Sequence, residues 1–182
     1  MNATCRLPIR TPALVLRHFV AADVPVIGAL NGEVSTRRWL PSHVYATQEA
    51  AAAAIGFLMS CYAEPGDPRL APYVLAIEHG DEGKLLGHVG FSPFDGEVEI
   101  SYAIAESARG RGHATEALVH ACDWLARAYG VTSVLAVTAS ENIASRRTLD
   151  RASFAHVRDE VMLFQGASEA VSRYRRHATC VS

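Results

Sequence analysis

The sequence contains a single lysine, Lys84, and no block of like charges along its 182 residues. Its 17 basic and 19 acidic residues give a formal net charge of -2 at pH 7. This balance removes the positive field that draws a protein to nucleic acid or to an anionic membrane, so we expect neither as a partner. Nearly all the positive charge is arginine, whose planar set of donors suits carboxylates and phosphates, although genomic base composition produces the same bias.

Cysteine and long apolar runs are also scarce. The cysteines stand far apart, without the CxxC spacing of a zinc site or the density of a disulfide-stapled secreted domain. The apolar run Leu14 to Leu16 is too short for a signal peptide, and the run Ala50 to Met59 is about half of a membrane span. We therefore expect a cytoplasmic protein with free thiols at Cys5, Cys61, Cys122 and Cys180.

The middle of the chain holds three strand-like runs: Tyr73 to Glu78, Lys84 to Ser92 and Glu97 to Ala105. Turn-forming glycine, proline and aspartate residues separate them, which indicates an antiparallel meander. In the third run apolar residues alternate with polar ones such as Glu97 and Glu99. One face of this strand is therefore expected in the core, and the other meets solvent or a cleft.

Helical patterns lie on both sides of the meander. A short helix that Asp23 would cap and an alanine-rich helix after Thr47 precede it. Beyond it, apolar residues keep helical spacing from Gly112 to Tyr129, and a short helix is expected from about Asn142 to Ala152. The remaining segments are strand-like: Val131 to Thr138 and the stretch from Ala155 onward.

A glycine-rich loop, RGRGHAT, joins a strand end to a helix start at Arg109 to Thr115. Its glycines and small residues let the backbone approach a ligand closely, and the first N–H groups of the helix lack intrahelical partners. Together with the positive end of the helix dipole, these groups form a binding site for an anion such as a pyrophosphate. Arg109 and Arg111 would add charge-assisted hydrogen bonds.

Other interpretations of this loop differ in strength. A dinucleotide fingerprint needs G-x-G-x-x-G, but Thr115 replaces the third glycine, and the loop follows a meander rather than the first strand of a βαβ unit. A Walker A loop is excluded because the sequence has no Gly-Lys-Ser/Thr. A plain connecting turn stays open as an alternative, since short glycine motifs are common.

The segment from Glu99 to Leu118 resembles the acetyl-CoA motif of the GCN5-related N-acetyltransferases (GNAT), R/Q-x-x-G-x-G/A. Arg109, Gly112 and Ala114 occupy the defined positions of that motif. The order of the flanking strand, loop and helix is also the expected one.

Two further segments resemble one branch of this superfamily, the RimJ/RimL-like ribosomal-protein alanine N-acetyltransferases. Asn142 to Phe154 is similar to the N-x-x-S and Gly-Phe close of that branch, with Ser153 in place of the glycine. Leu14 to Arg17, followed by Asp23, is similar to its opening. The resemblance covers most of the chain.

The resemblance and the order of elements together predict an α/β (α+β) fold. We expect a single N-acetyltransferase domain over residues 1–182, with a mixed, mostly antiparallel sheet of about seven strands and helices on both faces. The acetyl-CoA motif would cover residues from about 98 to 129, and a second cofactor-side segment residues from about 131 to 154. The cofactor cleft is expected where the strand ending at Ile104 and the strand beginning at Val131 diverge.

The resemblance implies acetyl-CoA as co-substrate and no metal. Backbone N–H groups of the loop would hold the pyrophosphate, and the preceding strand end would lie along the pantetheine and polarise the thioester carbonyl. Asn142 would bond the pantetheine or cap its own helix. The residues assigned to acetyl-CoA are Tyr102, Ala103, Ile104, Arg109, Gly110, Arg111, Gly112, His113, Ala114, Thr115 and Asn142.

The resemblance also implies catalytic roles for two residues. Glu99, on the polar strand face, is the candidate general base through water, although Glu97 shares that face and a solvated strand glutamate is the alternative. Many members of the superfamily use a tyrosine as general acid where this chain has Leu149, so the branch points to Ser145 as the acid. A serine there would equally cap or pack within its helix.

The acceptor side is assigned to Trp39 and His88, with ordinary packing of both as the alternative. His113, Glu116 and His120 share one helix face, which we interpret as an exposed polar face rather than a metal site.

The expected activity is that of an N-acetyltransferase, an acyltransferase that transfers groups other than aminoacyl groups. It would act on a protein N-terminus or a small primary amine by direct attack. The alternatives are a catalytically silent acyl-CoA-binding or sensing domain and an acyltransferase for a bulkier acyl-CoA. We expect the protein to be a monomer or a homodimer.

Overall fold

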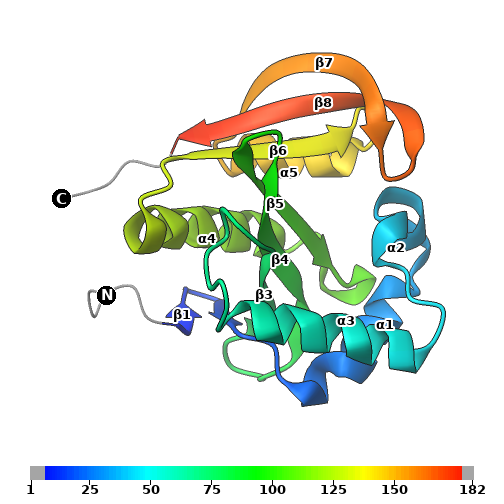
Figure 1. The fold of residues 1–182 in the computed structure, drawn as a ribbon, viewed down its shortest axis with the longest axis vertical. Helices are drawn as coiled ribbons and strands as arrows, with labels where there is room; N and C mark the ends of the chain where they lie inside the picture. Colours follow the sequence, from blue (N-terminus) through cyan, green and yellow to red (C-terminus); the bar gives the residue numbers. More distant parts are fainter. Residues whose placement is uncertain (1–6, 178–182) are drawn as a thin grey trace.

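An eight-stranded sheet runs through the protein, with helices packed on both of its faces (Figure 1). The structure is a computed structural model, and it describes residues 7–177. The strand order is β1-β2-β3-β4-β5-β6-β8-β7. The strands are β1 (Ile9–Arg10), β2 (Leu14–Arg17), β3 (Tyr73–His79), β4 (Leu85–Phe94), β5 (Glu97–Ile104), β6 (Ser133–Ala139), β7 (Ala155–Phe164) and β8 (Ala167–His177). The predicted α/β fold with a sheet of about seven strands is therefore confirmed.

One junction in the sheet differs from all the others. Neighbouring strands pair antiparallel throughout, except that β5 and β6 pair parallel at Val98 with Val134 and at Glu99 with Leu135. Beyond Glu99 the two strands separate, although β5 stays paired with β4 up to Ile104. The sheet thus opens on one side of β5, as predicted from the sequence.

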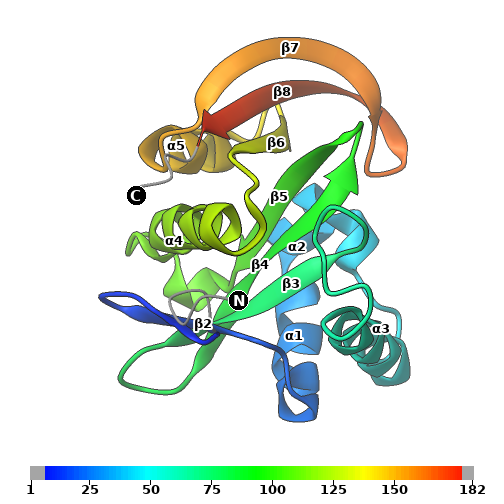
Figure 2. The same cartoon turned by 60° about the vertical axis from the view of Figure 1, so that its left-hand side comes forward.

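The helices divide between the two faces of the sheet (Figures 1 and 2). One face carries α1 (Val24–Asn31), α2 (Val34–Trp39) and α3 (Gln48–Cys61), and the other carries α4 (His113–Tyr129) and α5 (Ile143–Arg151). Three short 3₁₀ turns precede helices in the chain: η2 (Ala21–Asp23) before α1, η3 (Pro41–His43) before α3 and η4 (Glu106–Ala108) before α4.

Alternation along the strands supplies the two hydrophobic cores. In β3, Leu75 and Ile77 belong to the larger core beneath α4, whereas Ala76 belongs to a smaller core beneath α1 and α3. The α4 residues that face the larger core, among them Leu118 and Leu125, are fully buried. The period of two in the strand and of about 3.6 in the helix therefore orients the sheet between its two helical layers.

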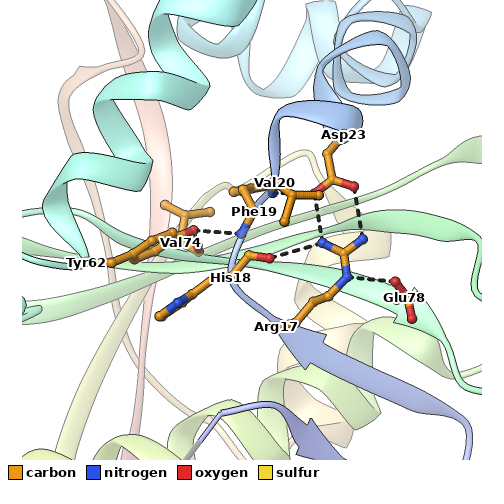
Figure 3. Close-up of polar contacts among 8 residues, drawn as sticks. All are labelled: Arg17, His18, Phe19, Val20, Asp23, Tyr62, Val74 and Glu78. Atoms are coloured by element: carbon orange, nitrogen blue, oxygen red, sulfur yellow. Dashed lines mark hydrogen bonds and ion pairs between the residues drawn. The ribbon is translucent and has the colours of Figure 1, made fainter.

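A charged cluster fixes the end of β2 against η2 and β3 (Figure 3). The Arg17 guanidinium donates to both carboxylate oxygens of Asp23, at 2.8 and 2.9 Å, and its Nε donates to Glu78 at 2.7 Å. Asp23 stands at the N-cap position of α1 but makes no side-chain cap bond to that helix; its carboxylate instead accepts from the Val20 N–H. The predicted capping role of Asp23 is therefore wrong, because the arginine competes for its oxygens.

A tyrosine joins the same region to α3. The Tyr62 hydroxyl donates to the Val74 carbonyl and accepts from the Phe19 N–H (Figure 3).

Cys61 and Cys122 are buried free thiols, and the other two cysteines lie outside the described residues. Within residues 7–177, no helix is both long and apolar enough to cross a membrane.

Candidate functional site

A cavity of about 450 Å³ opens where β5 and β6 separate. Its walls come from β5, the loop before α4 and its first turn, β6, α5 and α2. The lining residues are Ser35, Thr36, Trp39, Leu40, Ile100, Ser101, Tyr102, Ala103, Ile104, Ala108, Arg109, Gly110, Gly112, His113, Ala114, Thr115, Ala136, Val137, Thr138, Ala139, Asn142, Ala144, Ser145, Arg147, Thr148, Leu149, Arg151 and Phe164. Nearly all the residues that the sequence assigned to the cofactor are therefore brought together here.

The glycine-rich loop presents backbone N–H groups to this cavity. The first hydrogen bond of α4 joins Glu116 N to Gly112 O at 3.0 Å, so the N–H groups of residues 113–115 precede the helical pattern and have no carbonyl of their own helix. Gly110 and Gly112 adopt φ of 75° and 84°, a left-handed conformation that disfavours other residues. No protein atom lies within 4 Å of a Cβ built on either glycine, so a side chain there would enter the open space that a ligand needs.

The Arg109 side chain holds the loop in place. Its Nε donates to the Ile104 carbonyl at 2.7 Å, and its Nη2 lies 3.2 Å from a carboxylate oxygen of Glu33. Glu33 also accepts the Glu106 N–H with both oxygens. Arg109 therefore ties the end of β5 to the connection before α2, whereas Arg111 is exposed and lies outside the cavity lining.

Two hydroxyl groups meet inside the cavity. The Tyr102 hydroxyl, from β5, lies 3.0 Å from the Ser145 Oγ, from α5. Asn142 accepts the Ser145 N–H with its side-chain oxygen at 3.1 Å and so caps α5, as one of its two predicted roles requires. Burial raises the pKa of Tyr102, despite the hydrogen bonds from Ser145 and Thr148, so the phenol stays protonated at neutral pH.

Glu99 lies at the last residue pair before β5 and β6 separate, one residue from the lining of the cavity. Burial raises the pKa of Glu99 to about 7, against the opposing influence of Arg173. Its neighbour on the same face, Glu97, is held by Arg175 at 2.7 Å. The geometry therefore favours Glu99 over Glu97 as a group that can gain and lose a proton near the cavity.

One wall of the cavity comes from α2, and contacts connect α2 and η3 to the elements opposite. Trp39 lines the cavity as predicted, and the Arg38 guanidinium lies 4.3 Å from the centre of its ring. Arg38 also reaches Glu141, before α5, at 3.5 Å. In η3, Ser42 hydrogen-bonds Gln165 in the turn between β7 and β8.

His88 does not line this cavity, although the sequence assigned it to the acceptor. It is buried in β4, with its ring centre 5.5 Å from that of His43 in η3. Burial, with a smaller contribution from His43, lowers the pKa of His88 to about 3, so it is a neutral core residue at physiological pH. The alternative of ordinary strand packing describes it better.

The face of α4 with His113 and Glu116 is not the exposed polar face that the sequence predicted, because His113 is buried and Glu116 is half-buried. His113 Nδ1 lies 3.2 Å from the Ala108 carbonyl, and Glu116 accepts the Thr11 hydroxyl and the Ala13 N–H. Among the residues that the structure describes, no three His, Cys, Asp or Glu side chains are grouped as metal ligands.

The sequence reasoning missed several lining residues, above all Arg147 and Arg151 on α5 and Phe164 at the end of β7. Their spacing of four residues, directly after the N-x-x-S segment, places the two arginines on one helix face and would have pointed to them. No comparable pattern pointed to Phe164, because only one undivided strand-like stretch from Ala155 onward was expected there.

Comparison with known families adds to this geometry. The family model described as an acetyltransferase (GNAT) domain matches residues 13–155, which is more than half of the chain. The chain belongs to the GNAT acetyltransferase family. The match takes in every element that walls the cavity of this GNAT domain except the end of β7.

Solved structures of other acetyltransferases share its fold. A ribosomal-protein-S5-alanine acetyltransferase from Vibrio fischeri superposes with a TM-score of 0.79 at 16% identity, covering 97% of this chain and 100% of the other. RimL, a ribosomal L7/L12 alpha-N-protein acetyltransferase in complex with coenzyme A, gives 0.80 at 17%, covering 95% and 98%. The microcin C7 self immunity acetyltransferase MccE, in complex with acetyl-CoA and AMP, gives 0.76 at 15%, covering 92% and 93%.

These identities are low enough that the likeness establishes the fold and no more. No curated protein matches the chain at a significant level of sequence similarity. The predicted family is thus confirmed, and the activity of this GNAT domain has to be argued from its own site.

Proposed function

We propose that the protein transfers the acetyl group of acetyl-CoA to a primary amine by direct attack. The observation that carries this proposal is the cavity between the separated strands, which combines a backbone anion site at residues 113–115 with a hydroxyl pair and a nearby carboxyl of raised pKa. Two of the structures that share its fold hold coenzyme A or acetyl-CoA.

The residues present fit acetyl-CoA. The two left-handed glycines leave the approach to the first turn of α4 open, where N–H groups and the helix dipole favour a diphosphate. The edge of β5 from Ser101 to Ile104 faces the same cavity and offers backbone groups along an extended pantetheine chain. A donor from this edge to the thioester oxygen would stabilise the negative charge that develops there during attack.

Glu99 is the proposed base. The amine must be neutral to attack, and it loses a further proton as the new C–N bond forms. Glu99 would take that proton through a bridging water, since it lies beside rather than within the cavity lining. Its pKa of about 7 suits a group that must be ionised before attack and accept a proton afterwards.

Ser145 is the proposed acid, and Tyr102 is the residue that positions it. When the C–S bond breaks, the sulfur takes the bonding electrons and needs a proton, which the Ser145 hydroxyl would donate. The Tyr102 hydroxyl lies 3.0 Å away and would replace that proton, so that both residues end as they began once solvent resupplies the phenol. Leu149 stands where many members of the superfamily have tyrosine, so the phenol of this pair comes from β5 instead.

The test follows release of the free thiol of CoA from acetyl-CoA. The acceptors are peptides with free N-termini, single amino acids and polyamines, and N-acetylated peptides serve as the matched controls. We expect thiol release only with a free amine. Binding of acetyl-CoA in calorimetry without thiol release for any acceptor would contradict the proposal and favour a silent acyl-CoA-binding domain, whereas faster release from longer acyl-CoAs would favour a different acyl donor.

A further inference from the structure

The charged side chains that line the cavity are all positive, although the protein carries a net charge of -2. Its lining includes three arginines, Arg109, Arg147 and Arg151, and no aspartate or glutamate within residues 7–177. Such a one-sided lining concentrates a positive potential in the cavity. The cavity therefore selects for a ligand with several negative charges.

The three arginines are not equivalent. Arg109 is already bonded to Ile104 and Glu33 and serves the loop. In contrast, Arg147 and Arg151 are exposed, and neither forms a hydrogen bond or an ion pair with any residue of the described chain. Two guanidinium groups with five donors each thus remain available to a ligand.

The adjacent Arg146 is a useful contrast. Its guanidinium donates to the Tyr174 hydroxyl at 3.1 Å and to the Ser140 carbonyl at 3.3 Å, so it is part of the protein's own packing against β8. Arg147 and Arg151 are four residues apart and therefore share one face of α5, and both line the cavity.

Arg151 is the more distant of the two arginines from the reacting groups. It stands six positions after Ser145, which corresponds to about 9 Å along the helix, whereas Arg147 is two positions after Ser145 and lies on a different side of α5. The backbone anion site belongs to a different element, the start of α4, which packs beside α5 on the same face of the sheet (Figure 2). The cavity thus offers a second anion-binding region, which is separate from the backbone site of α4.

We propose that Arg147 and Arg151 bind the 3′-phosphate of coenzyme A, which rests on the proposed function as an acetyl-CoA-dependent enzyme. Coenzyme A carries a diphosphate and one separate phosphomonoester on its ribose. The start of α4 accounts for the diphosphate, and a phosphomonoester matches two flexible guanidinium forks on the neighbouring helix. This pair makes the site selective for coenzyme A over the same molecule without its 3′-phosphate.

The experiment compares the affinities of CoA and 3′-dephospho-CoA by isothermal titration calorimetry. The wild-type protein should bind CoA about tenfold more tightly. The Arg147→Ala/Arg151→Ala variant should lose most of this preference while keeping its affinity for 3′-dephospho-CoA, and the dependence of CoA binding on salt should become weaker.

The matched control is Arg10→Ala/Arg127→Ala. These two arginines are also exposed and without ion-pair partners among residues 7–177, but they lie outside the cavity lining. The control removes the same net charge and should keep the preference for CoA. Circular dichroism checks that each variant is folded, and the single variant Arg151→Ala replaces the double variant if that one does not fold.

The outcomes distinguish this inference from the proposed function. Binding of neither molecule by the wild-type protein would overturn the proposed function itself. Equal affinity of the wild-type protein for both would overturn only the 3′-phosphate site, as would an equal loss for both molecules in the Arg147→Ala/Arg151→Ala variant. If the Arg10→Ala/Arg127→Ala control also lost the preference for CoA, overall charge would explain the result, and the 3′-phosphate site would again be overturned.

Discussion

A single carboxyl group, that of Glu99, carries most of the pH dependence we expect. Burial raises its pKa to about 7, against the opposing charge of Arg173, at the point where β5 and β6 part. Alternation along the strand predicted the face on which Glu99 lies. The burial that sets its pKa depends on elements far away in the sequence and was not predictable.

The first prediction concerns the pH profile. Glu99 must be ionised to act as a base, so kcat/KM should rise with pH and level off above about 7. The Glu99→Gln variant should lose this rise and be slower by about a hundredfold at the plateau. The profile is measured with a weakly basic acceptor, so that protonation of the amine does not contribute. Glu97→Gln is the control and should keep the wild-type profile, because Arg175 already pairs with Glu97.

A second prediction concerns the hydroxyl pair of Ser145 and Tyr102. Ser145→Ala should lower kcat by about tenfold to a hundredfold with little change in the KM for acetyl-CoA. Tyr102→Phe keeps the ring and removes only the hydroxyl, so its loss of kcat should be smaller. Because the two act as one unit, the double variant should be little worse than Ser145→Ala. A raised KM with an unchanged kcat would instead assign both residues to binding.

The sequence did not predict the contacts of residues whose neighbours are distant along the chain. His88 stands in a strand beside the expected cleft, but His43 covers it and burial removes it from the cavity. Arg109 belongs to the acetyl-CoA motif, but its side chain hydrogen-bonds the Ile104 carbonyl and pairs with Glu33 within the protein. Motif spacing located Arg109, and its strand position suggested His88, but only the packed structure shows what the two side chains touch.

At the scale of single elements, the helices α3, α4 and α5 followed their local signals closely, whereas the sequence carried no helical signal for α2. Gly112 and Gly130 adopt left-handed φ at the two ends of α4, as residues without a Cβ are expected to do. The β7 and β8 strands were foreseen only as an undivided stretch from Ala155 onward. The reason is that β7 is largely exposed on both faces, which leaves no apolar alternation to divide the segment.

The turn after α5 provides a stability prediction. Ser153 adopts φ of 62°, which strains a residue with a Cβ. Ser153→Gly should raise the free energy of unfolding by about 1 kcal/mol, the relief of strain exceeding the greater freedom of glycine in the unfolded chain. Urea denaturation measures the change.

The control for this variant is Ser107→Gly. Ser107 is also an exposed serine in a turn, but it is not among the residues with positive φ. Its replacement should leave stability unchanged or lower it slightly. Equal effects of the two substitutions would show that strain at Ser153 is not the cause.

At the scale of the whole molecule, the Arg17 cluster connects β2 and β3 of the sheet to η2, at the start of α1. Arg17→Met should lower the free energy of unfolding by about 2–3 kcal/mol at neutral pH, because it leaves the buried carboxylate of Asp23 without its partner. Burial opposes ionisation of Asp23, but hydrogen bonds from Arg17 and Val20 outweigh it and lower its pKa. The stabilisation is therefore present above the pKa of unfolded aspartate and is lost as the pH falls through the lower folded value.

Denaturation at several pH values tests this prediction. The difference between the wild-type protein and Arg17→Met should shrink as the solution becomes acidic and Asp23 is protonated. Arg69→Met is the control: Arg69 also pairs with an aspartate, Asp67, but the Arg69 side chain is exposed, so its removal should lower the free energy of unfolding much less. A difference that stays constant with pH would contradict the assigned role of Asp23.

The separation of β5 from β6 has a consequence for how a ligand is held. From Ile100 to Ile104, β5 is a central strand on one side and an edge strand on the other, because it pairs with β4 but no longer with β6. An edge strand offers its N–H and C=O groups to any extended chain that carries amides. A ligand lying there takes the place of a missing strand, and the backbone of β5 recognises it whatever side chains this family places around the cavity.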